Sequence, residues 1–209
     1  MVAYASSWTV KNSKVMTQNE IDTVLADLTP KAMKSHQALI KLLIFRLTTF
    51  CGLRVTEMSL LNIEDIYLNN EQPYIRIRAE TAKGKKGREV PIYSEATVSE
   101  VKTWLAIRAT MGASKGDPLL VSVSRDSMGH RFSRQGARNR FRAACKALGE
   151  ERAKSLTIHA GRHTAISQLL EKSVPIAIVR NLAGHSSISV TNIYTGIFHG
   201  RQVQNYNID

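Results

Sequence analysis

Apolar residues recur at helical spacing along most of this chain, in blocks separated by short polar stretches. In the first block, residues 17–28, they fall three or four positions apart and therefore on one helical face. These residues are Ile21, Val24, Leu25 and Leu28. Thr17 and Glu20 open the block with the spacing of a capping box, in which each side chain binds the other residue's backbone N–H. A second block, residues 35–50, is apolar on nearly every side, which predicts a buried helix.

The middle of the chain has a different pattern. Two short runs, residues 74–79 and 89–92, predict β-strands. Glycines on both sides of Lys85 and Lys86 predict a hairpin turn between them, whose tip can carry a flexible lysine into a groove. A second hairpin-like turn is expected around Gly129.

Helical periodicity returns in the second half. The predicted helical segments are residues 94–111, 133–148, 160–172, 175–183 and 187–195. Residues 1–15 are polar and aperiodic, and we expect a flexible arm there. The predicted fold class is therefore mainly α with a small antiparallel β-sheet (α+β).

The composition narrows the class of protein. The sequence has 209 residues, 43% of them hydrophobic, which is enough to bury one core. Its net charge of +12 indicates a polyanionic partner, whose binding should weaken as salt rises because counterions are released. No apolar run reaches about 18 residues, so we expect no membrane span, and the first residues lack the features of a signal peptide. Cys51 and Cys145 have neither metal nor disulfide spacing, and we expect reduced thiols in the cytoplasm.

The last third of the chain carries one phenol and several phosphate-binding groups in a fixed order. His159 and Arg162 come three residues apart, and His185 precedes Tyr194 by nine residues. A phenol has a pKa of about 10, so its attack on a phosphodiester at neutral pH needs fixed positive charge and proton acceptors around the phosphate. This set therefore predicts DNA strand cleavage through a covalent phosphotyrosine.

Two upstream elements complete the set. Gly52 ends the apolar block and allows a sharp turn, after which Arg54 emerges three residues before Glu57. An arginine fork suits two phosphate oxygens, and Glu57 could hold that fork in place; a purely structural ion pair is the alternative. The second element is the lysine cluster of the hairpin, which could instead be a solvated turn. Its three lysines leave the catalytic one open.

A basic segment, residues 125–146, contains seven Lys or Arg residues and one acidic residue. Three of its arginines recur every four residues and so share one helical face, which can lie along a duplex on phosphates and base edges. The alternative is a basic helix that only faces solvent. The candidate DNA-binding residues of the chain are Lys85, Lys86, Arg88, Arg131, Arg134, Arg138 and Arg142.

These motifs together resemble the catalytic domain of the tyrosine recombinases, also called the phage integrase family. The residues that fall on the family's motif positions are Arg54, Lys83, His159, Arg162, His185 and Tyr194. The segments that carry them, GLRVTE, AKGKKGREVPI, HAGRH and LAGHSSISVTNIY, extend over residues 52–194. The resemblance implies the family's DNA breaking-rejoining fold, and it favours Lys83 over Lys86 as the catalytic lysine. Gly161 departs from the usual bulky apolar residue, and we expect it to loosen its helix by about 1 kcal/mol relative to alanine.

The resemblance also implies how protons and bonds move. Tyr194 would attack the scissile phosphate and form a 3'-phosphotyrosyl bond. Lys83 would protonate the leaving 5' oxygen, and His159 would serve as the general base or proton relay for the phenol. The 5'-hydroxyl of a partner strand would then reverse the reaction.

The remaining residues would hold the phosphate. By the resemblance, Arg54 and Arg162 clamp its non-bridging oxygens, His185 donates a further hydrogen bond, and Glu57 orients Arg54. Bond energy is conserved in the phosphotyrosine, so we expect no cofactor, and no Asp/Glu cluster suits a metal such as Mg²⁺.

The resemblance gives the domain organisation as well. Residues 16–196 form the expected catalytic domain, without the family's amino-terminal clamp domain. The chain is either part of a longer integrase or a naturally short member of the size of the fimbrial phase-switch invertases, and we favour the second. We expect a monomer when free and a homo-tetramer on two DNA sites when active, with residues 197–209 docking on a neighbouring protomer. A cytoplasmic, nucleoid-associated location would follow.

Two other functions share part of this pattern. A type IB topoisomerase-like enzyme would use the same chemistry to relax DNA without strand exchange. A DNA-binding regulator derived from an integrase would share the charge, but it should have lost a catalytic group, and all six are present.

Overall fold

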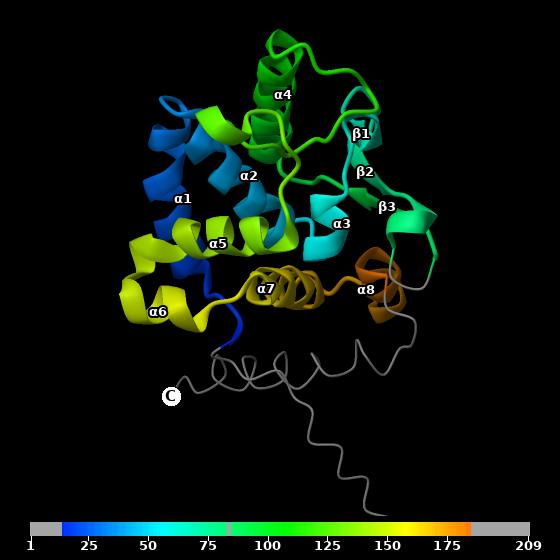
Figure 1. Cartoon of the computed structure of the whole chain (residues 1–209). Helices are drawn as coiled ribbons and strands as arrows, with labels where there is room; N and C mark the ends of the chain where they lie inside the picture. The colour runs from blue at the N-terminus through cyan, green and yellow to red at the C-terminus, as the bar shows by residue number, and fades with distance from the viewer. Residues whose placement is uncertain (1–13, 83–84, 185–209) are drawn as a thin grey trace, which may run out of the picture.

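The computed structural model describes residues 14–82 and 85–184. Figure 1 shows a mostly helical protein with a three-stranded antiparallel sheet at one side, which confirms the predicted fold class. Within the described residues, no helix is both long and apolar enough to cross a membrane. Cys51 and Cys145 are buried free thiols.

The first two helices form where the apolar pattern places them. In α1 (Gln18–Ala32) the capping box is present: the Thr17 hydroxyl accepts the Glu20 N–H at 3.2 Å, and the Glu20 carboxylate accepts the Thr17 N–H at 2.8 Å. α2 (His36–Thr49) is buried along almost its whole length. Local capping and burial agree in these segments, so the sequence predicts them well.

A short helix and the sheet follow α2. α3 (Val55–Ser59) leads to β1 (Ile66–Tyr67), which pairs with β2 (Tyr74–Ile77), and β2 pairs in turn with β3 (Arg88–Pro91). β2 ends two residues earlier than predicted because the chain turns into a 3-10 helix at Ala79–Thr81. Lys83 and Gly84, in the predicted hairpin, lie outside the described residues.

The other helices are α4 (Glu95–Thr110), α5 (Arg134–Ala144), α6 (Glu150–Ser155), α7 (Ile158–Glu171) and α8 (Ile176–Ala183). The predicted helix 133–148 is wrong at its end, because α5 changes to a 3-10 helix at Cys145–Leu148. Gly149, with φ of +88°, then turns the chain into α6, which was not predicted. The turn at Gly129 is confirmed, but its flanks share only an isolated bridge, Val121 with Arg131. The predicted helix 187–195 lies outside the described residues.

α2 is the centre of the core and packs against α1, α4, α5 and α7. Gly161 of α7 lies at the point where α7 crosses α2 and α5. A Cβ atom on this glycine would lie 2.9 Å from the Phe141 ring and 3.0 Å from the Thr48 hydroxyl oxygen. The expectation for Gly161 therefore missed its packing role: the glycine keeps its cost in helix propensity, but the missing side chain lets α7 approach its neighbours closely.

The first described residues, just before α1, pack against α7. Val15 is buried, and the Met16 N–H donates to the Thr164 hydroxyl at 2.9 Å. Arg152 of α6 donates to the Val15 carbonyl at 3.2 Å and pairs with Glu20 at 2.6 Å. The predicted flexible arm thus does not include Val15, and residues 1–13 lie outside the described part.

Candidate active site

Arg54 begins α3 directly after a turn at Gly52, whose φ is +63°. Its backbone N–H and its guanidinium both donate to Glu57, at 3.0 Å and 2.8 Å, and a further guanidinium N–H donates to the Gly184 carbonyl at 2.8 Å. The Arg54 side chain is 18% exposed. Glu57 therefore holds both the backbone and the side chain of Arg54.

Glu57 is shared between two arginines. Arg88, at the start of β3, donates from both terminal nitrogens to the two carboxylate oxygens of Glu57, each at 2.8 Å. Burial alone would raise the pKa of Glu57, but the hydrogen bonds and charges of Arg88 and Arg54 outweigh it and lower the pKa to about 2. One buried carboxylate therefore fixes two guanidinium groups.

The contacts of Arg88 lie within the protein, whereas the sequence predicted a contact with DNA. Besides its two bonds to Glu57, its Nε–H donates to the Leu182 carbonyl at 2.8 Å, and its side chain is only 10% exposed. The planar guanidinium is thus turned toward α3 and α8 rather than toward solvent. A sequence reading misses this because a lysine- and arginine-rich turn usually faces solvent.

Arg162 lies on α7, and its side chain also contacts the end of α8. Its guanidinium donates to the Gly52 carbonyl and, at 2.6 Å, to the Ala183 carbonyl. The side chain is buried. Arg162 therefore ties the turn before Arg54 to the end of α8.

Arg54, Arg88 and Arg162 together hold the carbonyls of three consecutive residues at the end of α8, 182–184; we call them the arginine cap. The last carbonyls of a helix lack intrahelical partners and carry partial negative charge, so they attract guanidinium groups. Gly184 has φ of +63°, and a Cβ there would lie 2.9 Å from Arg88 Nη1. Glycine suits this position, because other residues rarely adopt its φ and a side chain there would displace the Arg88 guanidinium.

Two histidines lie on α7 beside Arg162. His159 is exposed in the first turn, but partial desolvation against the helix, followed by the positive charges of Arg138 and Arg162, lowers its pKa from the ordinary 6.5. His163, one turn later, has its pKa lowered to about 4, mainly by burial and then by the charge of His159. A histidine with a lowered pKa is neutral at pH 7, and His159 in that state can accept a proton.

The structure brings together three of the six predicted catalytic residues. Arg54 and Arg162 meet at the end of α8, and His159 lies on the same helix as Arg162. The other three lie outside the described residues: Lys83, His185 and Tyr194. Among residues 14–82 and 85–184, no group of three or more His, Cys, Asp or Glu side chains could hold a metal ion.

The predicted DNA-binding residues divide into two groups. The first group is exposed on the surface, on α5 or in the hairpin: Lys85, Lys86, Arg134, Arg138 and Arg142. Arg131 belongs with Arg88 in the second group, because its guanidinium donates to the carbonyls of Ser59 and Leu61 and, at 2.6 Å, to the Asn62 side chain. Arg131 therefore links the loop before α5 to the end of α3 through hydrogen bonds.

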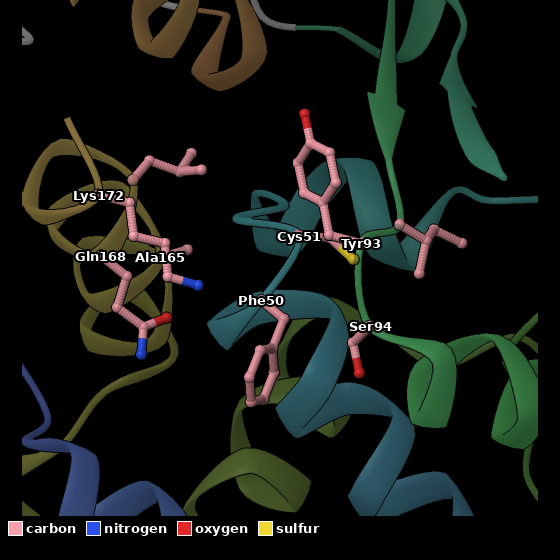
Figure 2. A pocket seen from close by; sticks show the side chains of 9 residues that line it. Phe50, Cys51, Tyr93, Ser94, Ala165, Gln168 and Lys172 are labelled. Carbon is pink, nitrogen blue, oxygen red and sulfur yellow. The ribbon is translucent and has the colours of Figure 1, made fainter. Parts of the chain in front are cut away.

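A cavity of about 210 Å³ opens between the end of α2, the segment after β3, and α7 (Figure 2). The side chains labelled around it are Phe50, Cys51, Tyr93, Ser94, Ala165, Gln168 and Lys172. It has apolar walls with polar groups at its edge. None of its lining residues is a predicted catalytic residue.

The fold and the site define a tyrosine recombinase catalytic domain, and the model of the Phage integrase family matches residues 14–200 of the chain. The protein belongs to this family. The chain is 33% identical over 166 residues to the tyrosine recombinase XerC of Neisseria gonorrhoeae, covering 79% of this chain and 48% of that protein. It is 31% identical over 184 residues to XerA of Pyrococcus furiosus, covering 88% and 57%. The chain thus spans about half the length of the curated relatives it matches.

Solved structures share the fold. A crystal structure of XerA recombinase superposes with a TM-score of 0.74 and 22% identity, covering 100% of this chain and 68% of that one. XerH recombinase bound to its palindromic difH substrate superposes with a TM-score of 0.70 and 22% identity, covering 93% and 52%.

Proposed function

We propose that this chain cleaves and rejoins double-stranded DNA at specific sites through a 3'-phosphotyrosyl intermediate. The observation that carries the proposal is the meeting of Arg54 and Arg162 at the end of α8, although 108 positions separate them in the sequence. Two guanidinium groups held by backbone and by a buried carboxylate form a preorganised site for a phosphodiester. The residue that follows this cap is His185.

The chemistry balances without an external energy source. The phenol oxygen of Tyr194 attacks phosphorus while the bond from phosphorus to the 5' oxygen breaks. The phenol proton passes to His159, and Lys83 supplies a proton to the leaving 5' oxygen. A 5'-hydroxyl from a partner strand later attacks the phosphotyrosine and releases Tyr194, so the number of phosphodiester bonds is conserved.

The phosphate is held throughout both steps. Arg54 and Arg162 neutralise the two non-bridging oxygens, and His185 adds a hydrogen bond. Glu57 keeps Arg54 in place, as its two contacts with that residue support. These interactions strengthen as charge accumulates on the pentacoordinate phosphorus, which is where stabilisation speeds the reaction.

Duplex DNA is the proposed substrate. Support comes from the net charge of +12 and from an exposed face of α5 that carries Arg134, Arg138 and Arg142. The structural relatives include XerH bound to difH and a lambda integrase dimer bound to a COC' core site. Lys85 and Lys86 are proposed to contact the backbone beside the scissile phosphate.

The working assembly is proposed to be a tetramer on two DNA sites, because two duplexes contribute four strands to an exchange. Residues 16–196 form the catalytic unit, and residues 197–209 are proposed to dock on a neighbouring protomer. A cytoplasmic, nucleoid-associated location is proposed for a protein that acts on DNA.

Covalent capture tests the proposal. The protein and its Tyr194→Phe variant are incubated with genomic DNA and denatured, and the DNA that stays attached is sequenced. Adducts formed only by the protein with Tyr194 would support strand cleavage and reveal the site. Adducts followed by relaxation without exchange would favour a topoisomerase-like enzyme. Tight binding without adducts would favour a DNA-binding regulator.

A further inference from the structure

Arg88 connects three parts of the fold that carry different catalytic groups. It is the first residue of β3 and pairs in register with Ile77 of β2, so it stands at the base of the hairpin. Its guanidinium donates to Glu57 of α3 and to the Leu182 carbonyl of α8. The hairpin carries Lys83, and α3 begins at Arg54.

We infer that Arg88 is a positioning residue for the strand-cleavage reaction. It fixes the base of the lysine hairpin to Glu57 and to the end of α8, so that Lys83 reaches the leaving oxygen. The inference rests on the proposed function. Lys83 precedes Arg88 by five residues. Among the described side chains that donate a hydrogen bond to the end of α8, Arg88 is the nearest to Lys83 in the sequence. Without that anchor, the base of the hairpin would lose its hydrogen bond to α8.

The contacts require an arginine. The donors of a guanidinium diverge in one plane and reach Glu57 and Leu182 together, whereas those of a lysine start from a single nitrogen. A lysine at this position could still neutralise Glu57 but would not reproduce the three bonds. Arg54 would keep both of its own bonds to Glu57. Loss of the Arg88 fork should therefore affect the hairpin more than the phosphate clamp.

The test compares two leaving groups on one preparation of protein. A duplex containing the captured site is made with either the normal 5' oxygen or a bridging 5' sulfur at the scissile phosphate. A thiolate leaves readily without a general acid, because the pKa of a thiol is about 8.5. For Arg88→Lys we expect cleavage of the oxygen substrate to slow about 10- to 100-fold, below the full loss of a general acid, while the sulfur substrate stays within about threefold of wild type.

Three comparisons complete the design. Lys83→Ala should show the same selective loss on oxygen, because it removes the acid itself. Arg76→Lys, the same substitution on β2, should leave both rates unchanged, because Arg76 contacts Tyr67 and Asp65 and lies outside the arginine cap. Arg88→Gln, which keeps amide donors without the charge, repeats the measurement if Arg88→Lys is unstable. The ratio of the two rates does not depend on the folded fraction.

The outcomes separate the two proposals. An unchanged oxygen-to-sulfur rate ratio for both Arg88 variants would overturn the positioning role, whether both rates stay at the wild-type value or fall equally. If wild type forms no adduct with any DNA, the proposed function itself fails. A selective loss on the oxygen substrate supports the positioning role.

Discussion

Replacing Gly161 by alanine should destabilise the protein, although alanine is the better helix former. The new Cβ would lie 2.9 Å from the Phe141 ring, 3.0 Å from the Thr48 hydroxyl oxygen and 3.1 Å from that of Thr49. Phe141 is fully buried and stacks on Phe45 with ring centroids 5.9 Å apart. The Thr48 hydroxyl donates to the carbonyls of Ile44 and Phe45, so it is held in place as well.

The two opposing effects can be compared. Overpacking a core costs about 1–3 kcal/mol. Relief of the glycine penalty in a helix returns about 1 kcal/mol. We expect a net loss in the free energy of unfolding of about 1 kcal/mol, or about 2–4 °C in Tm for a domain of this size.

Gly136→Ala is the matched control. Gly136 also lies in a helix, α5, but a Cβ there would meet its nearest atoms at 3.4 Å and 3.5 Å, which is ordinary contact. This variant should gain about 0.5 kcal/mol. Thermal and urea unfolding of both variants measure the contrast. A rise in Tm for Gly161→Ala equal to that for Gly136→Ala would refute the close packing of α7 against α2 and α5.

Two further predictions concern charge. Glu57 has a pKa lowered to about 2 from the ordinary 4.5, so its contribution to stability is present above pH 4.5 and is lost as the pH falls toward 2. The free energy of unfolding of wild type should therefore fall steeply in this pH range. Glu57→Gln should be less stable at pH 7 by about 3 kcal/mol, and its free energy of unfolding should depend less on pH below 4.5. Equal dependence of stability on pH in the two proteins would contradict the role of Glu57 as a carboxylate shared by two arginines. Arg138→Ala should weaken DNA binding and reduce the slope of log affinity against log salt by about 1, measured by anisotropy titrations; an unchanged slope would place Arg138 away from phosphate.

The sequence predicts those parts of the fold that depend on neighbours close along the chain. The capping box at Thr17 and the apolar run of α2 are examples, because local bonds and a continuous buried face define both elements. α6 was missed because its six residues are too few to show helical periodicity. The candidate catalytic residues were chosen because their order along the chain matches a family, not because the sequence shows their contacts.

The roles of individual basic residues depend on distant partners. Arg88 and Arg131 lie in the same basic, glycine-containing stretches of sequence as the exposed lysines and arginines. What distinguishes them is a set of carbonyl oxygens and a carboxylate that the fold brings near, such as Leu182 for Arg88. Gly161 is a similar case, since helix propensity describes the glycine alone while Phe141 and Thr48 decide its effect.

The arginine cap also bears on the order in which the protein folds. Its bonds span 94 residues between Arg88 and Leu182, and 130 between Arg54 and Gly184. Contacts of such long range form late, after local helices, because closing large loops costs entropy. A chain emerging from the ribosome would therefore contain Arg54 and Arg88 well before α8 supplies the carbonyls that hold them. On the proposed function, the ability to cut DNA arises only in the last stage of folding, so unfinished chains would not nick DNA.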